Sequence, residues 1–162
     1  MEIFPDFLRT EVLHPLFVHF PIALLLVATL FKIAGLWPKG KFLDLPASIL
    51  LFLGTLGGWM AIYTGNLADG IVSRNLCDPT VLKTHENTAY TMIWLFTSAL
   101  ILDVVYQAGI LNFKSSIARG LLIILLLIGS GYVGFVGHSG ASLVYEQAAG
   151  VNIPSANCDE FN

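Results

Sequence analysis

The sequence HPLFVHFP, residues 14–21, places two histidines and two prolines at the start of a long apolar run. A histidine inside a membrane segment is costly, so it points to a functional position. The run Pro15–Trp37 is interrupted only by His19 near its beginning and by Lys32 near its end. Because a helix needs about 20 residues to cross about 30 Å of hydrocarbon, this run predicts a transmembrane helix.

Three further runs are long and apolar enough to span a membrane: Phe42–Tyr63, Ala89–Ala108 and Ile117–Val136. The chain is 56% hydrophobic and 12% charged, whereas ordinary soluble domains carry about 25% charged residues. This composition excludes a water-soluble globule. We therefore predict an all-α integral membrane four-helix bundle that forms one domain over residues 1–162. We expect it to contact the lipid membrane and not to bind nucleic acid.

The connections predict how these helices are arranged. Pro38–Lys41 and Gly109–Ser116 are short, so each joins antiparallel neighbours in an up-and-down bundle, and a longer loop is expected at Thr64–Thr88. The side with the short connections carries most of the cations: Lys32, Lys39, Lys41, Lys114 and Arg119. Because cations favour the cytoplasmic side, we predict a multi-pass plasma-membrane protein with both termini outside the cell. Residues 1–14 lack the basic segment of a signal peptide, so the first helix is expected to be retained.

In this topology all four histidines lie at the outer end. His14 and His19 open the first helix, His85 precedes the third and His138 closes the fourth. Any one of them alone suits an ordinary interfacial position, but four at one end favour a shared site. His14 and His19 differ by about 140° of rotation and about 7.5 Å of rise, so they face different directions. We predict two ligand pairs, His19 with His138 and His14 with His85.

Glycines in the second and fourth helices leave room beside these histidines. They are Gly54, Gly57, Gly58 and Gly65, and Gly129, Gly131, Gly134 and Gly137. Small residues allow membrane helices to pack closely, and they equally leave space for a flat macrocycle. The dipeptide Gly58-Trp59 corresponds to Gly131-Tyr132, and His14 is spaced similarly from His85. This correspondence suggests a duplicated helical hairpin.

The two end motifs, HPLFVHFPIALL at residues 14–25 and GHSGASLVYEQAAGV at residues 137–151, resemble an uncharacterised bacterial membrane family. That family has four predicted helices and is catalogued as a domain of unknown function. Its motif positions match His14, Pro15, His19, Pro21, His85, Gly137, His138, Gly140, Leu143, Val144 and Tyr145. Gly140-Ala141 replaces the usual glycine pair. Relatives are sometimes fused to, or encoded beside, Rieske or cytochrome c modules, so the resemblance implies redox work without a settled activity.

We interpret the chain as a membrane b-type cytochrome with one or two haem b groups held by axial histidines. The cations expected near the haem propionates are Arg9, Arg74 and Lys83. Aromatic residues that pack on the ring, or lie at the membrane interface in the ordinary way, are Trp59, Tyr63 and Tyr132. We expect electron transfer with a soluble cytochrome c, a Rieske protein or quinol. The chain would then be a redox subunit or a homo-oligomer rather than a stand-alone enzyme.

Two alternatives stay open. One is a zinc or copper site made by three or four of the histidines, since neutral imidazole suits both metals. The other is a structural membrane subunit whose histidines are incidental. A covalently attached haem c is excluded, because the chain has no C-x-x-C-H motif.

The remaining candidate residues are assigned structural roles. Cys77 and Cys158 are both expected outside the cell, where disulfides persist, so we predict a bridge that ties the C-terminal tail over the histidine end, with two unpaired thiols as the alternative. Asp44 and Asp103 lie toward the cytoplasmic end. Their expected partners are Lys32, Lys41 or Arg119.

Overall fold

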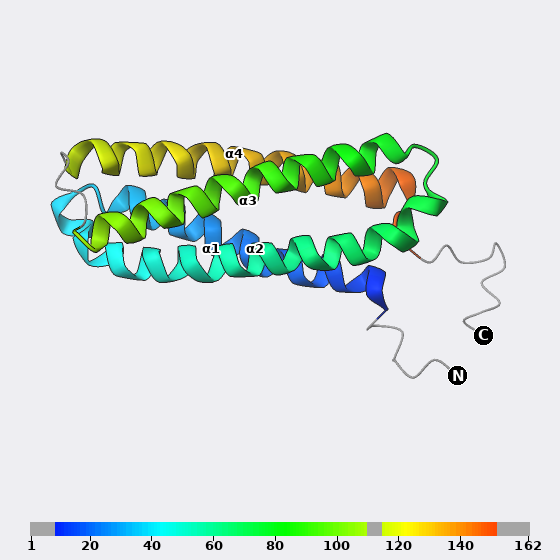
Figure 1. Cartoon of the computed structure of the whole chain (residues 1–162), viewed down its shortest axis with the longest axis horizontal. Helices are drawn as coiled ribbons and strands as arrows, with labels where there is room; N and C mark the ends of the chain where they lie inside the picture. Colours follow the sequence, from blue (N-terminus) through cyan, green and yellow to red (C-terminus); the bar gives the residue numbers. More distant parts are fainter. Residues whose placement is uncertain (1–8, 110–114, 152–162) are drawn as a thin grey trace.

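The computed structural model describes residues 9–109 and 115–151. Its four long helices are α1 (Thr10–Ala34), α2 (Asp44–Val72), α3 (Pro79–Gln107) and α4 (Ser115–Gln147), with short 3₁₀ helices η2 (Pro38–Leu43) and η3 (Ser73–Asn75). The helices run up and down in sequence (Figure 1). α1 packs mainly on α2 and α3 mainly on α4, while α2 with α3 and α1 with α4 join the two hairpins. The predicted all-α up-and-down bundle is confirmed.

The prediction of a long loop over Thr64–Thr88 was wrong. α2 continues to Val72 and α3 already begins at Pro79, so most of this stretch is helical. α4 likewise continues to Gln147, well beyond the predicted end at Val136. Hydropathy detects only the part of a helix that crosses hydrocarbon, whereas the backbone stays helical into the polar turns beyond it. His85 therefore lies inside α3 and does not precede it, and His138 lies within α4 and does not close it.

The start of α3 shows why the chain turns where it does. Asp78 is the residue before the helix, and its carboxylate accepts hydrogen bonds from the Thr80 backbone N–H at 2.9 Å and from the Thr80 hydroxyl at 2.6 Å. Pro79 occupies the first helical position, where its missing N–H has no cost. Because these bonds favour the charged form, they lower the pKa of the Asp78 carboxyl.

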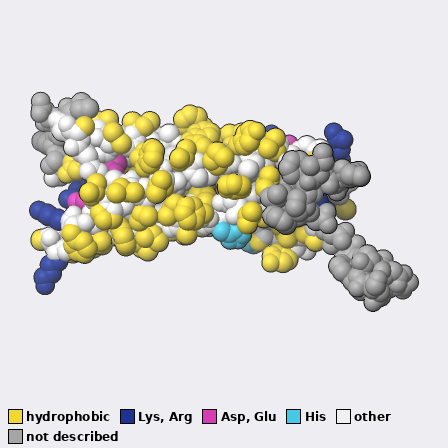
Figure 2. Space-filling model, turned by 90° about the horizontal axis from the view of Figure 1, so that it is seen from below, with side chains coloured by type: hydrophobic (Ala, Val, Ile, Leu, Met, Phe, Trp, Pro, Cys, Tyr) yellow, Lys and Arg dark blue, Asp and Glu magenta, His cyan; other side chains and the backbone are white. Residues whose placement is uncertain are grey.

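The outer surface of the bundle is apolar. Four helical segments are long and apolar enough to cross a membrane: Thr10–Ala34, Pro38–Asn75, Pro79–Gln107 and Ser116–Gln147. Large hydrophobic side chains point outward along them, with Phe20 68% and Leu30 63% exposed. Figure 2 shows hydrophobic side chains over most of the middle of one face, with cations toward the ends. Such a surface is stable against lipid and unfavourable against water.

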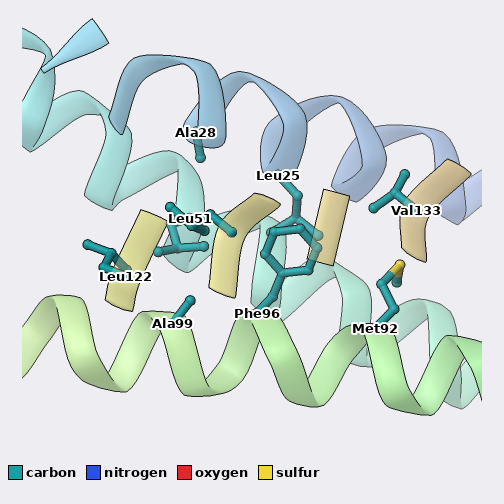
Figure 3. Packing of buried hydrophobic residues seen from close by; sticks show 9 residues of the cluster. Leu25, Ala28, Leu51, Met92, Phe96, Ala99, Leu122 and Val133 are labelled. Atoms are coloured by element: carbon teal, nitrogen blue, oxygen red, sulfur yellow. The ribbon is translucent and has the colours of Figure 1, made fainter. Parts of the chain in front are cut away.

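The core contains side chains from all four helices (Figure 3). Leu25, Leu51, Phe96 and Leu126 are at most 1% exposed and pack in one cluster. The Phe96 ring packs so closely on α4 that a Cβ at Gly129 would lie 3.0 Å from it. The glycine therefore allows α3 and α4 to pack closely against each other at this level.

The two ends of the bundle differ in chemistry. We call the end where α1 begins and α4 ends the histidine end, and the other the lysine end. At the lysine end Lys32 Nζ lies 2.6 Å from Asp103 Oδ1, and Arg119 lies 2.8 Å from Asp44. Two of the predicted partners are thus confirmed: Lys32 pairs with Asp103, and Arg119 pairs with Asp44. Neither pair uses Lys41.

Candidate functional site

A cavity of about 530 Å³ opens at the histidine end between the two hairpins, and we call it the histidine pocket. His14 from α1 and His85 from α3 both line it. Their ring centroids are 6.2 Å apart and their planes are nearly perpendicular, at 84°. Both side chains are half-buried. The wall deeper in the pocket is apolar and includes Val18, Ile22, Leu25, Met92 and Val133.

One nitrogen of each of these two rings has a fixed partner. His14 Nδ1 lies 2.9 Å from the Ala61 carbonyl oxygen, which can only accept, so this nitrogen carries a proton and donates. His85 Nδ1 lies 3.0 Å from Ser139 Oγ. The Ser139 hydroxyl donates its own proton to the Val136 carbonyl at 3.0 Å, so it accepts from His85.

These bonds set the same tautomer in both rings. In a neutral imidazole with the proton on Nδ1, the Nε2 atom keeps its lone pair. Metal-binding histidines use this arrangement, since a bond from the other ring nitrogen fixes the tautomer and raises ligand basicity. His14 and His85 therefore each present an Nε2 atom that can bind a metal.

Each ring lies against a glycine of its own hairpin. A Cβ at Gly65 of α2 would lie 3.1 Å from the His14 ring, and a Cβ at Gly140 of α4 would lie 3.1 Å from the His85 ring. Gly65 follows Ala61, the acceptor for His14, by four residues, whereas Gly140 directly follows Ser139, the acceptor for His85. Both hairpins thus place a glycine of their second helix against the ring of a histidine in their first helix. The duplicated helical hairpin suggested by Gly58-Trp59 and Gly131-Tyr132 stays a prediction.

The other two histidines are placed differently. His19 is exposed and lines the pocket, and its Nδ1 lies 2.7 Å from the Pro15 carbonyl in its own helix. His138 is exposed and is not part of the pocket lining, because the inward positions of this turn of α4 belong to Ser139 and Gly140. The structure brings His14 and His85 together. It shows no such contact between His19 and His138 in the described ranges.

No group of three or more His, Cys, Asp or Glu side chains suited to a metal ion occurs within residues 9–109 and 115–151. The zinc or copper site of three or four histidines stays an untested alternative. Sequence reasoning also missed Ala61 and Ser139, the two groups that fix the rings. Ser139 stands next to a histidine in the chain, but its contact with His85 depends on how α3 packs against α4.

Charged residues surround the mouth of the pocket. Glu11 and Glu86 line it. Arg9 lies 3.5 Å from Glu11, and Lys83 lies 2.5 Å from Glu86. Two of the three cations expected near haem propionates are therefore at the mouth, where each is paired with a carboxylate. The third, Arg74, is exposed in η3 at the same end.

The aromatic residues expected to pack on a ring do not line the pocket. Trp59 packs edge-to-face on Trp94 at 5.1 Å and donates a hydrogen bond to Thr97, while Tyr63 is exposed and Tyr132 packs against the core. Cys77 is exposed. Its predicted partner Cys158 lies outside the described residues, so the disulfide stays a prediction.

Residues 10–152 match the family model described as predicted membrane protein (DUF2231). No curated protein and no solved structure matches the chain significantly. The family match covers nearly the whole chain, as the resemblance of the end motifs implied, and it agrees with the four candidate spans. The chain is a multi-pass membrane protein that belongs to the DUF2231 family.

Proposed function

We propose that this protein is a membrane b-type cytochrome in which His14 and His85 bind one haem b between the two hairpins. The observation that carries the proposal is the matched tautomer of the two rings, which leaves both Nε2 atoms available in one cavity. Two imidazoles on opposite sides of one metal ion, each with its nitrogen about 2 Å away, have ring centres about 6 Å apart. The separation of 6.2 Å is close to that value.

The number of ligands favours haem over a bare metal ion. Zinc sites in proteins use three or four protein ligands, and the described residues offer two histidines in contact and no larger cluster. Haem iron needs only axial ligands from the protein, because the macrocycle occupies the remaining positions. A pair of imidazoles is therefore a complete ligand set for haem.

The pocket also suits the rest of the haem. Its volume of about 530 Å³ falls in the usual range for cofactor sites. Its inner wall of Val18, Ile22 and Met92 is apolar, whereas its mouth is charged. The macrocycle would contact the apolar wall, and the propionates would lie at the mouth, where Arg9 and Lys83 can exchange their carboxylate partners for propionates.

Bound haem would supply one-electron transfer. The protein residues would hold the iron, through His14 and His85, and would set its potential through the bonds to Ala61 and Ser139 and through burial. The cation bias in the sequence supports an extracytoplasmic position for this end. A soluble cytochrome c, a Rieske protein or quinol would then exchange electrons there, with this chain acting as a redox subunit or a homo-oligomer.

An optical spectrum of the detergent-purified protein, expressed with ample haem, tests the proposal. We expect a Soret band, with sharp α and β bands after reduction and a haem content near one per chain. Two haems per chain would require the second predicted pair, His19 with His138. A protein without haem that contains stoichiometric zinc or copper, or no metal at all, would contradict the proposal in favour of a metal site or a structural subunit.

A further inference from the structure

A buried ion pair at the lysine end has no role in the proposed haem site. The side chains of Lys32 and Asp103 are 5% and 1% exposed, and both residues lie in candidate membrane spans. Ionisable residues in such positions are rare and usually functional. On α1, Lys32 is 18 residues from His14, or about 27 Å of helix. Whatever this pair does is therefore separate from the histidine pocket.

Two neutral polar side chains connect the ion pair to the surface. Ser48 Oγ lies 2.6 Å from Asp103 Oδ2 and 2.8 Å from Lys32 Nζ. The exposed Gln107 donates from Nε2 to Ser48 and, at 3.3 Å, to Asp103 Oδ2. Because Gln107 uses its amide nitrogen for both contacts, its side-chain oxygen can accept a hydrogen bond from a ligand.

A groove of about 350 Å³ begins at these polar groups. Ser48, Asp103 and Gln107 form one end, and the rest of its wall is apolar: Ile49, Phe52, Leu53, Leu100 and Val104. Phe52 is 54% and Val104 is 57% exposed on the outer surface of α2 and α3. The groove therefore opens toward lipid, with a hydrogen-bonding end and an apolar side.

We propose that this groove binds the ring of a lipid-soluble quinone or hydroquinone. At the polar end the Gln107 side-chain oxygen can accept a hydrogen bond from a ring hydroxyl. The Gln107 amide nitrogen and the Ser48 hydroxyl, which bond to Asp103, would donate to a ring carbonyl by exchanging a partner. Phe52 and the aliphatic wall would contact the ring and its tail. The occupant approaches through the membrane, because the groove opens among exposed apolar side chains.

The charge of the groove selects against an anionic phospholipid head. Asp103 is the only charged residue in the lining, and Lys32, which neutralises it, lies behind it. A phosphate in the groove would face the Asp103 carboxylate and no cation of the groove lining, which is unfavourable in a low-dielectric site. A neutral ring with hydroxyl or carbonyl groups meets no such repulsion. This proposal concerns binding, and it does not depend on whether the histidine pocket holds haem.

Binding can be measured by equilibrium dialysis of the detergent-purified full chain against short-tailed benzoquinone and naphthoquinone, each in oxidised and reduced form. We expect saturable binding of one ligand per chain. The compound that binds most tightly shows whether the groove prefers a benzoquinone or a naphthoquinone ring, and in which oxidation state. Gln107→Ala should weaken binding about tenfold, the effect of one lost hydrogen bond to a bound ligand. Val104→Trp should abolish binding by filling the groove without touching the ion pair.

Thr91→Ala is the matched control, because Thr91 is an exposed polar residue of the same helix far from the groove. Circular dichroism and gel filtration should show all three variants folded. Absence of saturable binding to wild-type protein, unchanged binding by Val104→Trp, or displacement by phosphatidylglycerol at equal concentration would overturn the proposal. Each of these results would leave the haem proposal standing.

Discussion

Ser139 accepts a hydrogen bond from His85 across the α3–α4 hairpin, with Nδ1 and Oγ 3.0 Å apart. Its counterpart in the other hairpin is the Ala61 backbone carbonyl, which holds His14. A backbone carbonyl is present whatever the side chain, whereas the serine hydroxyl can be removed by mutation. The His14 ring is therefore fixed by a backbone group and the His85 ring by a side chain, and only the side chain can be removed by a point mutation.

Ser139→Ala should loosen His85 without removing it. Loss of a partner of a metal-binding histidine typically costs about 10- to 100-fold in affinity, so we expect weaker haem binding and a shifted midpoint potential. Haem titration and redox potentiometry measure both. Ser142→Ala is the control, since Ser142 lies on the same helix outside the pocket lining and donates a hydrogen bond to Glu146. Equal affinity and potential in Ser139→Ala and wild type would rule out this role for Ser139.

If the proposed haem site is right, His14→Ala and His85→Ala should each lose the haem, because either change removes one of the two proposed ligands. His19→Ala and His138→Ala should retain it, since these side chains are exposed and not paired in the described structure. Haem per chain in the four purified variants gives the result. Retention in both His14→Ala and His85→Ala would exclude this ligand pair, and loss in His19→Ala together with His138→Ala would favour the other predicted pair.

Gly65→Ala and Gly140→Ala should lower haem occupancy. In each, the new methyl group would lie 3.1 Å from a histidine ring and push that ring from its position. Gly70→Ala and Gly134→Ala are matched controls on the same two helices, because a Cβ at either meets no atom within 4 Å and neither glycine lines the pocket. Alanine favours helix by about 1 kcal/mol over glycine, so the controls should be as stable as wild type or more so. Full haem occupancy in Gly65→Ala and Gly140→Ala, as in the two controls, would contradict this prediction.

Lys32→Met should destabilise the bundle by about 3–5 kcal/mol, because it leaves the Asp103 carboxylate buried without its partner. The double variant Lys32→Met with Asp103→Leu should recover much of this loss, since no charge is then buried. Thermal or denaturant unfolding in detergent gives the comparison. A double variant less stable than Lys32→Met alone would mean that the two changes do not compensate each other.

The orientation in the membrane can be checked with the exposed Cys77 at the histidine end. In a Cys158→Ala background an impermeant thiol reagent should label Cys77 in intact cells, because the cation bias predicts that this end lies outside. Lys39→Cys in a chain without other cysteines should be labelled only after the cells are opened. The reverse pattern would invert the topology.

Much of the fold could be predicted from sequence. Runs such as Pro15–Trp37 must be helical in lipid, because the backbone groups can then bond only within the segment. The short links made the antiparallel pairs unavoidable, and the few buried charges, Lys32 and Asp103, had few candidate partners. The polar stretch at Thr64–Thr88 was misjudged, because polarity marks the end of a span and not the end of a helix.

The site depended on tertiary structure. The sequence alone determined that the histidines gather at one end, since their positions along the helices follow from the spans. It could not determine that His85 would bond to Ser139, that His14 would bond to the Ala61 carbonyl, or that His138 would face outward. Side-chain direction depends on the rotation of each helix about its own axis, and that rotation is set by packing between helices, such as Phe96 against Gly129. A rotation of about 100° separates neighbouring residues on a helix, enough to decide between His138 and Ser139.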